Sequence, residues 1–178
     1  MNTFKVAIIA LLLIIPSAIV KAQTFKATKS QTAALKKQAE EMASAMQNQN
    51  YNQMLYYTYP QIVKTMGGAE KMSTEFQAAS AQMRSRGISL KSVTIGNLSP
   101  IIASEGDLYS VVPDVVQVMV NGTLMTRGTS FLAISHDKGL RWYFVDTTPL
   151  KGKPLKKLFP TYPDGLVLPD VSNGMPGM

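Results

Sequence analysis

The chain has 178 residues, with 18 Lys+Arg, 11 Asp+Glu, one His and no Cys, and 46% of its residues are hydrophobic. This length fits one compact domain better than two. The apolar content, together with a charged fraction of 16%, excludes an intrinsically disordered chain. The absence of Cys excludes a disulfide scaffold, a thiolate metal site and a cysteine nucleophile. No reaction signature remains, so the functional argument has to start from the fold.

The N-terminus has the pattern of a secretory signal peptide, which we expect over residues 1–22. Lys5 precedes an unbroken apolar run at residues 6–15, and Val20 and Ala22 stand at the −3 and −1 positions of a cleavage site. Ten helical residues rise about 15 Å, which is half of a hydrocarbon core of about 30 Å. Cleavage is therefore favoured over a membrane anchor. We expect an exported protein, periplasmic or secreted, with no stable membrane span after cleavage.

The formal net charge of +7 is spread along the chain, and its densest stretch is residues 151–157, with four lysines in seven positions. Such a stretch would suit anionic headgroups, a cell-wall polymer or nucleic acid. No Arg or aromatic residue is interleaved with these lysines, as a nucleic-acid surface would require. A solvated connector is the favoured interpretation, and we expect no nucleic-acid partner.

Three apolar stripes at helical spacing predict three helices in the first half of the mature chain, over residues 32–48, up to about Thr58, and over 69–86. Each stripe follows the spacing i, i+4, i+7, i+11. Pro60 interrupts the second stripe, so we expect a turn from that residue on. Gly87 stands where a left-handed residue would end the third helix. The stripes are Leu35, Ala39, Met42 and Met46; Leu55, Tyr59, Ile62 and Met66; and Met72, Phe76, Ala79 and Met83.

Methionine is frequent in the chain, with 11 residues, and five of them lie on these stripes. The helical spacing favours core filling by soft side chains over a copper-binding thioether surface. A single His also leaves no imidazole cluster for a metal, so we expect neither a metal nor a cofactor. The stripe methionines are Met42, Met46, Met66, Met72 and Met83.

After Gly87 the apolar period changes from 3.6 to about 2, which predicts strands. Residues 88–90 and 93–95 alternate out of phase, which indicates a bulge or an edge near Lys91-Ser92. Asn121-Gly122 favours a two-residue type I′ hairpin, and residues 136–139 form a second hairpin loop. Neighbouring hairpins build an antiparallel sheet. The expected strand segments are 88–90, 93–95, 101–103, 108–112, 116–120, 123–125, 131–135 and 140–145.

The last thirty residues, 149–178, hold six of the ten prolines, which interrupt both helices and sheet ladders. We expect a proline-rich C-terminal extension in which residues 155–158 form one helical turn. Residues 166–168 would then lie as an extended strap on the domain.

Helices followed by a meandering antiparallel sheet resemble the cystatin-like α+β cone, also called the nuclear transport factor 2-like fold, over residues 33–147. Several short motifs, in order, also resemble a group of uncharacterised exported bacterial proteins. Those motifs are Tyr57-Thr-Tyr-Pro60, Gly67-Gly68, Ser135-His-Asp137, Gly139, Trp142-Tyr-Phe-Val-Asp146, Leu158-Phe-Pro160 and Leu166-Val-Leu-Pro169.

The resemblance implies an α+β domain over residues 23–148, in which N-terminal helices pack on a curved antiparallel sheet and a pocket lies between them. For the wider superfamily it implies a small-molecule pocket in some members and dimers in many. Catalysis occurs in a minority, such as ketosteroid isomerase-like, dehydratase-like and epoxide hydrolase-like enzymes.

Asp146 is the best candidate for a catalytic group, because an enzyme of this fold needs a titratable side chain in the apolar mouth of the cone. It shares strand parity with Trp142 and Phe144, so it would point the same way as those rings. An Asp at a strand end before Thr147 also caps turns, and this second interpretation is the favoured one.

Tyrosines cluster between residues 51 and 59, and hydroxyls of Tyr57 and Tyr59 are candidates for ligand contact together with Trp142 and Asp146. Packing at the rim of the core is the favoured role for these rings. His136, the one histidine, falls in a predicted hairpin loop, where a solvated side chain is expected.

Three functions compete. The favoured one is an exported non-catalytic binding or scaffold module that holds a hydrophobic small molecule or an envelope protein. The second is an isomerase- or dehydratase-like enzyme with Asp146 as general base and Tyr57 or Tyr59 as hydrogen-bond donor. The third is a purely structural homodimer joined through the sheet.

Overall fold

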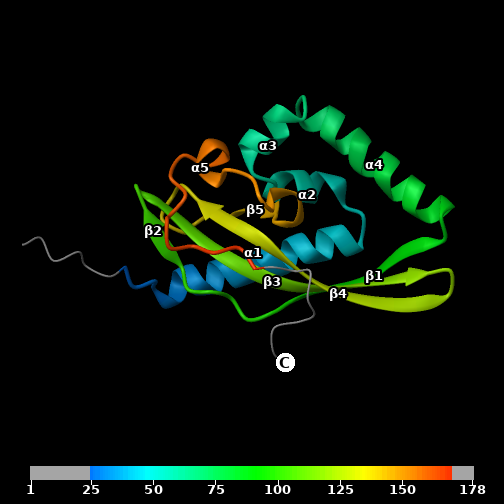
Figure 1. Ribbon diagram of the computed structural model, residues 1–178, viewed down its shortest axis with the longest axis horizontal. Helices are drawn as coiled ribbons and strands as arrows, with labels where there is room; N and C mark the ends of the chain where they lie inside the picture. Colours follow the sequence, from blue (N-terminus) through cyan, green and yellow to red (C-terminus); the bar gives the residue numbers. More distant parts are fainter. Residues whose placement is uncertain (1–24, 170–178) are drawn as a thin grey trace, which may run out of the picture.

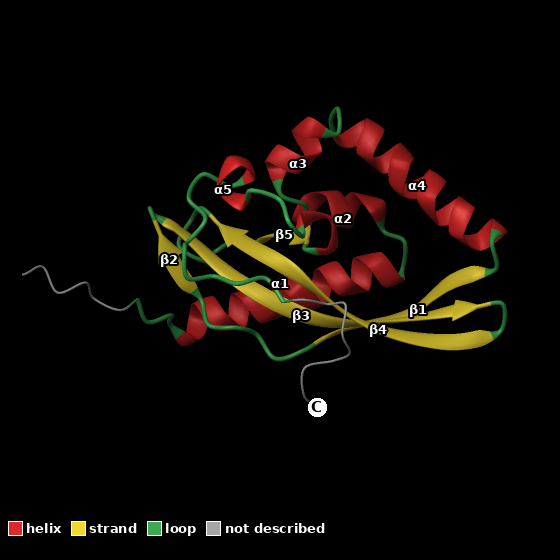
Figure 2. Cartoon of the chain, in the orientation of Figure 1, coloured by secondary structure: helices red, strands yellow, loops and turns green. Residues whose placement is uncertain are grey.

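The computed structural model describes residues 25–169, so the predicted signal peptide (1–22) and the end of the C-terminal extension (170–178) lie outside it. Within the described range, four helices come first and the strands follow (Figures 1 and 2). The elements are α1 (Lys29–Gln47), α2 (Tyr51–Tyr57), α3 (Pro60–Thr65), α4 (Ala69–Ser85), β1 (Ile88–Ile95), β2 (Ile102–Ser104), β3 (Asp107–Val120), β4 (Thr123–Ser135), β5 (Tyr143–Asp146), the 3₁₀ turn η1 (Thr148–Leu150) and α5 (Leu155–Leu158).

The strands form one antiparallel sheet in the order β1-β3-β4-β5, and β2 pairs with β3 beside this path. The sheet curls into a half-barrel, and helices cover it (Figure 1). The expectation of an α+β fold with N-terminal helices on a curved antiparallel sheet is confirmed. No helix within residues 25–169 is long and apolar enough to cross a membrane.

Helix α1 packs on one face of the sheet. It begins with a capping box, in which the Thr28 hydroxyl accepts from the backbone N–H of Gln31 and the Gln31 side chain accepts from that of Thr28. Its predicted stripe is buried as far as Met42. The core between α1 and the sheet is formed by Leu35, Ala39, Met42, Tyr57, Ile101, Leu108, Val112, Phe131, Ala133, Trp142 and Phe144.

The opposite face of the sheet is covered by the C-terminal segment, residues 148–168. Phe159 is fully buried there, and Leu166 also packs against the sheet residues. The predicted strap is therefore confirmed, as is the single helical turn at α5. The second core cluster comprises Tyr109, Val111, Leu132, Ile134, Val145, Leu150, Phe159, Tyr162 and Leu166.

Three local predictions are confirmed by backbone geometry. The register between β1 and β3 shifts between Leu90 and Ser92, which is the expected bulge. Asn121 and Gly122 have φ of 48° and 85°, as a type I′ turn requires. Gly87 ends α4 with φ of 70° and leads directly into β1.

Some expected boundaries were wrong. The predicted strand segments 108–112 and 116–120 form one strand, β3, which runs through Pro113 without a break. The missing N–H of Pro113 is tolerated because this residue lies where the pairing with β1 ends, and its carbonyl still accepts from Gly96 N at 2.8 Å. The turn expected at Pro60 is the short helix α3, with Pro60 at the first helical position, where no N–H is needed.

Two stripe methionines are not core residues. Met66 is 42% exposed and Met83 is 40% exposed, so the core-filling interpretation was wrong for them. Helix α4 packs through Met72, contacts α2 and α3, and then continues past α2 to reach β1 (Figure 2). Its second half lies across a cavity from the first residues of β1, and its apolar side chains Phe76, Ala79 and Met83 line that cavity.

Candidate functional site

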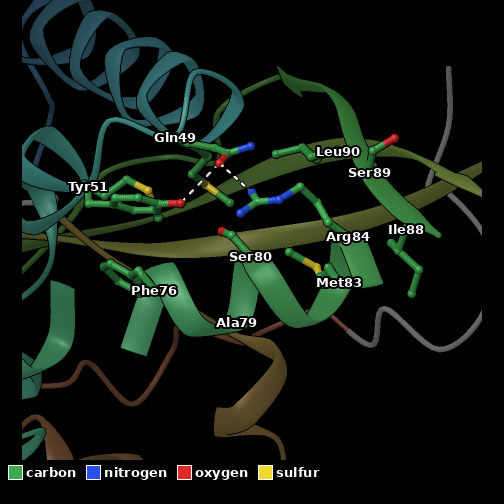
Figure 3. Close-up of a pocket in the computed structure, with 12 residues that line it drawn as sticks. Gln49, Tyr51, Phe76, Ala79, Ser80, Met83, Arg84, Ile88, Ser89 and Leu90 are labelled. Carbon is green, nitrogen blue, oxygen red and sulfur yellow. Dashed lines mark hydrogen bonds between the residues drawn. The ribbon is translucent and has the colours of Figure 1, made fainter. Parts of the chain in front are cut away.

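That cavity, which we call the α4 groove, lies between α4, the corner joining α1 to α2, and the first residues of β1 (Figure 3). It encloses about 210 Å³. Its size is below the roughly 300–1,000 Å³ of pockets that hold drug-sized molecules. The groove therefore suits a single apolar side chain or a short alkyl group. Its apolar lining includes Met46, Met54, Phe76, Met83, Ile88 and Leu90.

A small polar cluster stands on one side of the α4 groove (Figure 3). The Gln49 side-chain oxygen accepts from Arg84 Nη1 at 3.0 Å and from the Tyr51 hydroxyl at 3.2 Å. The ring of Tyr51 also stacks on Phe76 with centroids 6.4 Å apart. These contacts tie α4 to the start of α2 and hold one cationic side chain at the groove.

None of the four residues predicted as ligand contacts lines the α4 groove. Tyr57 is buried against α1, where its hydroxyl donates to the Glu41 carboxylate, and burial raises the pKa of this phenol. Trp142 is fully buried in the same cluster, and its backbone N–H donates to the Gln38 side chain at 2.9 Å. Its indole Nε1 has no hydrogen-bond partner among the described residues.

The other two predicted residues lie elsewhere. The ring of Tyr59 packs on the opposite side of the sheet, 5.4 Å from the Phe159 ring, and burial raises its pKa, as does the charge of Asp107. Asp146 is exposed at the end of β5, and its Oδ1 accepts from Thr148 N at 2.8 Å, which is the contact of a turn cap. The structure thus brings Tyr57 and Trp142 together in one core cluster and places Tyr59 and Asp146 at separate positions.

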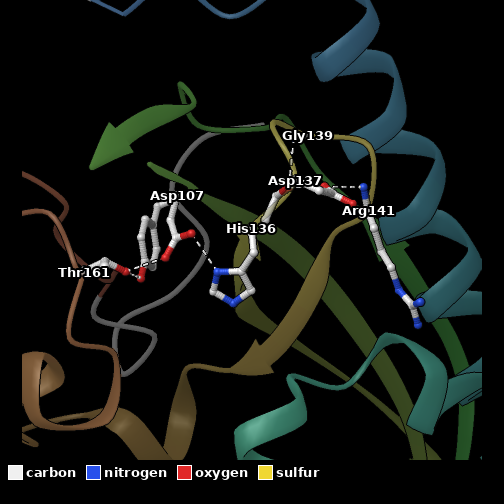
Figure 4. A network of polar contacts seen from close by, with 8 residues as sticks. Asp107, His136, Asp137, Gly139, Arg141 and Thr161 are labelled. Atoms are coloured by element: carbon white, nitrogen blue, oxygen red, sulfur yellow. Dashed lines mark hydrogen bonds and ion pairs between the residues drawn. The ribbon is translucent and has the colours of Figure 1, made fainter. Parts of the chain in front are cut away.

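A polar network that the sequence did not predict joins the start of β3 and the end of β4, which are neighbours in the sheet, to the C-terminal segment (Figure 4). Asp107 Oδ1 lies 2.7 Å from His136 Nδ1, and Asp107 Oδ2 accepts from the Thr161 hydroxyl at 2.7 Å. Thr161 also contacts the Tyr109 hydroxyl at 2.6 Å. His136 is 43% exposed, in keeping with the expected solvated side chain, and it is also paired with Asp107. Leu108 pairs with Ser135, so the register of β3 and β4 brings Asp107 and His136 together. The sequence alone does not give this register.

Asp114 is the second group that sequence reasoning missed. It lies on the α1-facing side of β3, is 2% exposed, and its Oδ2 accepts from the Thr129 hydroxyl at 2.6 Å. Its Oδ1 has no hydrogen-bond partner among the described residues. Burial raises the pKa of this carboxyl to about 6, and the charge of Asp146 adds to the shift. The available signal was a single Asp within the apolar run VVPDVV.

Within residues 25–169 no group of three or more His, Cys, Asp or Glu side chains is arranged to hold a metal ion. The described residues instead form three arrangements. These are the apolar α4 groove beside Arg84, the pair of Asp107 and His136, and the buried carboxyl of Asp114. No protein-family model matches the sequence, and a search of curated proteins finds no match.

Proposed function

We propose that this protein is an exported, non-catalytic binding module, and that the α4 groove holds an apolar group of its ligand or partner. The proposal includes membership of the cystatin-like cone superfamily, because helices on a half-barrel sheet are compatible with that fold. In this module the ligand site is the space beneath α4. The core between α1 and the sheet is formed by the protein's own side chains, and a second cavity of about 260 Å³ between α1 and β1 is lined in part by polar residues such as Glu40, Ser44 and Thr94.

The observation that carries this proposal is the apolar, solvent-accessible lining of the groove. Met83 is exposed there although it belongs to an apolar helix stripe, and Met46 and Met54 line the same cavity. Methionine side chains adapt to differently shaped apolar partners because they are unbranched and polarisable. An apolar group that covers this lining would remove its exposed apolar surface from water, which favours binding.

Neighbouring alanines on α4 provide a matched test. Ala78 and Ala79 are both exposed, but only Ala79 lines the groove. We expect Nile red, a neutral apolar dye, to bind the mature protein with a fluorescence increase, its short alkyl groups entering the α4 groove while its rings lie over the open mouth. Ala79→Trp fills the groove and should abolish this increase, whereas Ala78→Trp should leave it unchanged. No dye binding by the parent protein, or equal loss in both variants with the fold intact by circular dichroism, would overturn the proposal.

The enzyme alternative has weaker support in the geometry. Asp146, its proposed general base, is exposed and engaged with Thr148 N, and neither Tyr57 nor Tyr59 lies with it in one cavity. Asp146→Ala separates the interpretations, because a turn cap predicts loss of thermal stability alone. The homodimer alternative is tested by the sedimentation mass.

A further inference from the structure

We propose that the partner of the α4 groove is an extended peptide segment of alternating apolar and acidic residues, which adds as a strand to the free edge of β1. This inference rests on the proposed function and names the partner class for the same site. Addition of a strand uses main-chain hydrogen bonds for affinity and side-chain pockets for specificity.

Strand β1 is the terminal strand of the sheet, paired with β3 on one side, and within residues 25–169 no strand pairs with its other edge. Three consecutive residues, Ile88, Ser89 and Leu90, line the α4 groove (Figure 3). Successive side chains of a strand point to opposite faces, so three in a row reach one cavity only where the strand edge faces it.

The open edge of β1 is short. Gln47 Nε2 donates to the carbonyl oxygen of Lys91 at 3.3 Å, so a side chain already occupies the edge at that point. The open part is therefore the stretch from Ile88 to Leu90, next to α4. An edge of this length offers few main-chain hydrogen bonds, and we expect weak, rapidly reversible binding.

An apolar wall lies opposite the edge. Phe76 and Met83 project from α4 toward the cavity that β1 closes on the other side (Figure 3). An added strand would lie along this edge with its main chain at the open side of the groove, so that one side chain points into the groove and the next points away. One apolar side chain fits the 210 Å³ available, and its neighbours along the peptide would point away.

Cationic side chains surround the α4 groove and the open edge of β1. Arg84 lines the groove, Arg86 follows α4, and Lys91 follows the open edge. Residues 83–100 contain no Asp or Glu. None of these three cations forms an ion pair within residues 25–169. Acidic side chains that flank the apolar one on the added strand would therefore be attracted to this end of the molecule, which steers association and selects the partner. A second copy of this chain would bring the same cations to the site, so an acidic partner is favoured over self-association.

The test uses a blocked octapeptide, EVTLEVTE, titrated into the mature protein and followed by amide chemical shifts and hydrogen exchange. We expect the amides of residues 88–90 to shift and to gain protection, and the peptide to displace Nile red. Methylating alternate peptide nitrogens on the pairing edge should weaken binding by about tenfold or more, because each net hydrogen bond contributes up to about tenfold. The basic analogue KVTLKVTK should bind at least about fivefold more weakly.

A matched pair of charge reversals tests the steering. Arg84→Glu should lower the affinity for EVTLEVTE by about fivefold or more. Arg127→Glu, a change at another exposed arginine, on β4, should alter it by less than about twofold. Equal effects of the two reversals, or equal binding of KVTLKVTK, would overturn the charge argument, and equal binding of the methylated peptide would overturn strand addition.

The outcomes also separate this inference from the proposed function. Dye binding that is lost in Ala79→Trp, combined with no peptide binding, would leave the binding module standing and overturn the peptide partner. Absence of both dye and peptide binding would overturn both. Peptide binding that shifts amides elsewhere, and not those of residues 88–90, would overturn the assignment to β1.

Discussion

The side chains of Asp107 and His136 are joined by a contact of 2.7 Å between Oδ1 and Nδ1, although the residues are 29 positions apart. Asp107 also accepts from Thr161 through its second carboxylate oxygen, at 2.7 Å. One carboxylate thus connects the start of β3, the end of β4 and the C-terminal segment (Figure 4).

Asp107→Ala removes both contacts, and we expect it to lower the free energy of unfolding by roughly 1–3 kcal/mol. The C-terminal segment should open first, because Thr161 loses its carboxylate partner. Urea denaturation measures the stability, and hydrogen exchange over residues 148–168 locates the change. Asp164→Ala is the control: this carboxylate sits in the same segment and pairs with Lys156, but it is well exposed. Similar small effects of the two variants would contradict the proposed connecting role.

The buried carboxyl of Asp114 should give stability a distinct pH dependence. Its pKa is raised from 3.8 to about 6, so between those values the folded protein binds this proton and the unfolded chain does not. The free energy of unfolding therefore falls as pH rises through that interval, by roughly 3 kcal/mol at most. Asp114→Asn removes this component and should be more stable than the parent above pH 6.

Urea denaturation between pH 4 and 7 measures the effect of Asp114. Asp164→Asn, a change at an exposed carboxylate, should keep the parent's pH dependence. If the difference in stability between Asp114→Asn and the parent is the same at pH 4 and pH 7, the carboxyl does not titrate as its burial requires.

Much of the fold was predictable because its signals are local. The stripe through Leu35 and Ala39 identified the buried face of α1, and the Asn121-Gly122 pair identified the hairpin between β3 and β4. Long-range placement was not predictable from these signals. Met72 and Met83 belong to one stripe, but only Met72 is buried, because α4 continues past its partners.

The candidate site was largely missed for the same reason. The α4 groove is assembled from four elements, and no single stretch of sequence contains its pattern. Strand parity correctly aligned Trp142 with Phe144, and both are buried toward α1. Parity gives no information on where a strand leaves the core. It therefore could not predict that Asp146 is exposed and Asp114 is buried.

We expect Tyr57 to stabilise the fold and to have no role in ligand binding. Its hydroxyl donates to Glu41, and the groove does not include it. Tyr57→Phe should lower the free energy of unfolding by roughly 1.5–3 kcal/mol, the range for hydrogen bonds to charged groups, with Nile red affinity unchanged. Tyr56→Phe serves as control, because Tyr56 is largely exposed and the Arg141 guanidinium would still lie over its ring. A fall in dye affinity in Tyr57→Phe alone would favour a ligand role.

The turn at Gly87 joins α4 to β1. We therefore expect its backbone conformation to affect both the stability of the fold and the shape of the α4 groove. Its φ is 70°, and a Cβ there would lie 2.3 Å from Asn121 Oδ1. Gly87→Ala should destabilise the fold by roughly 1–2 kcal/mol through left-handed strain, and more if Asn121 cannot move away. Thermal unfolding measures the loss, and Nile red affinity reports on the groove.

Two further variants separate the causes at Gly87. Gly165→Ala should be neutral or slightly stabilising, because no heavy atom lies within 4 Å of the added methyl group and its φ is not in the left-handed region. In Gly87→Ala combined with Asn121→Gly, the contact with the amide oxygen is absent, and Gly-Gly still fits a type I′ turn. Stability recovered relative to Gly87→Ala measures the steric part, and the remaining loss measures the backbone strain. If Gly87→Ala alone matches the parent, then neither the conformation nor the close approach at this turn constrains how α4 meets β1.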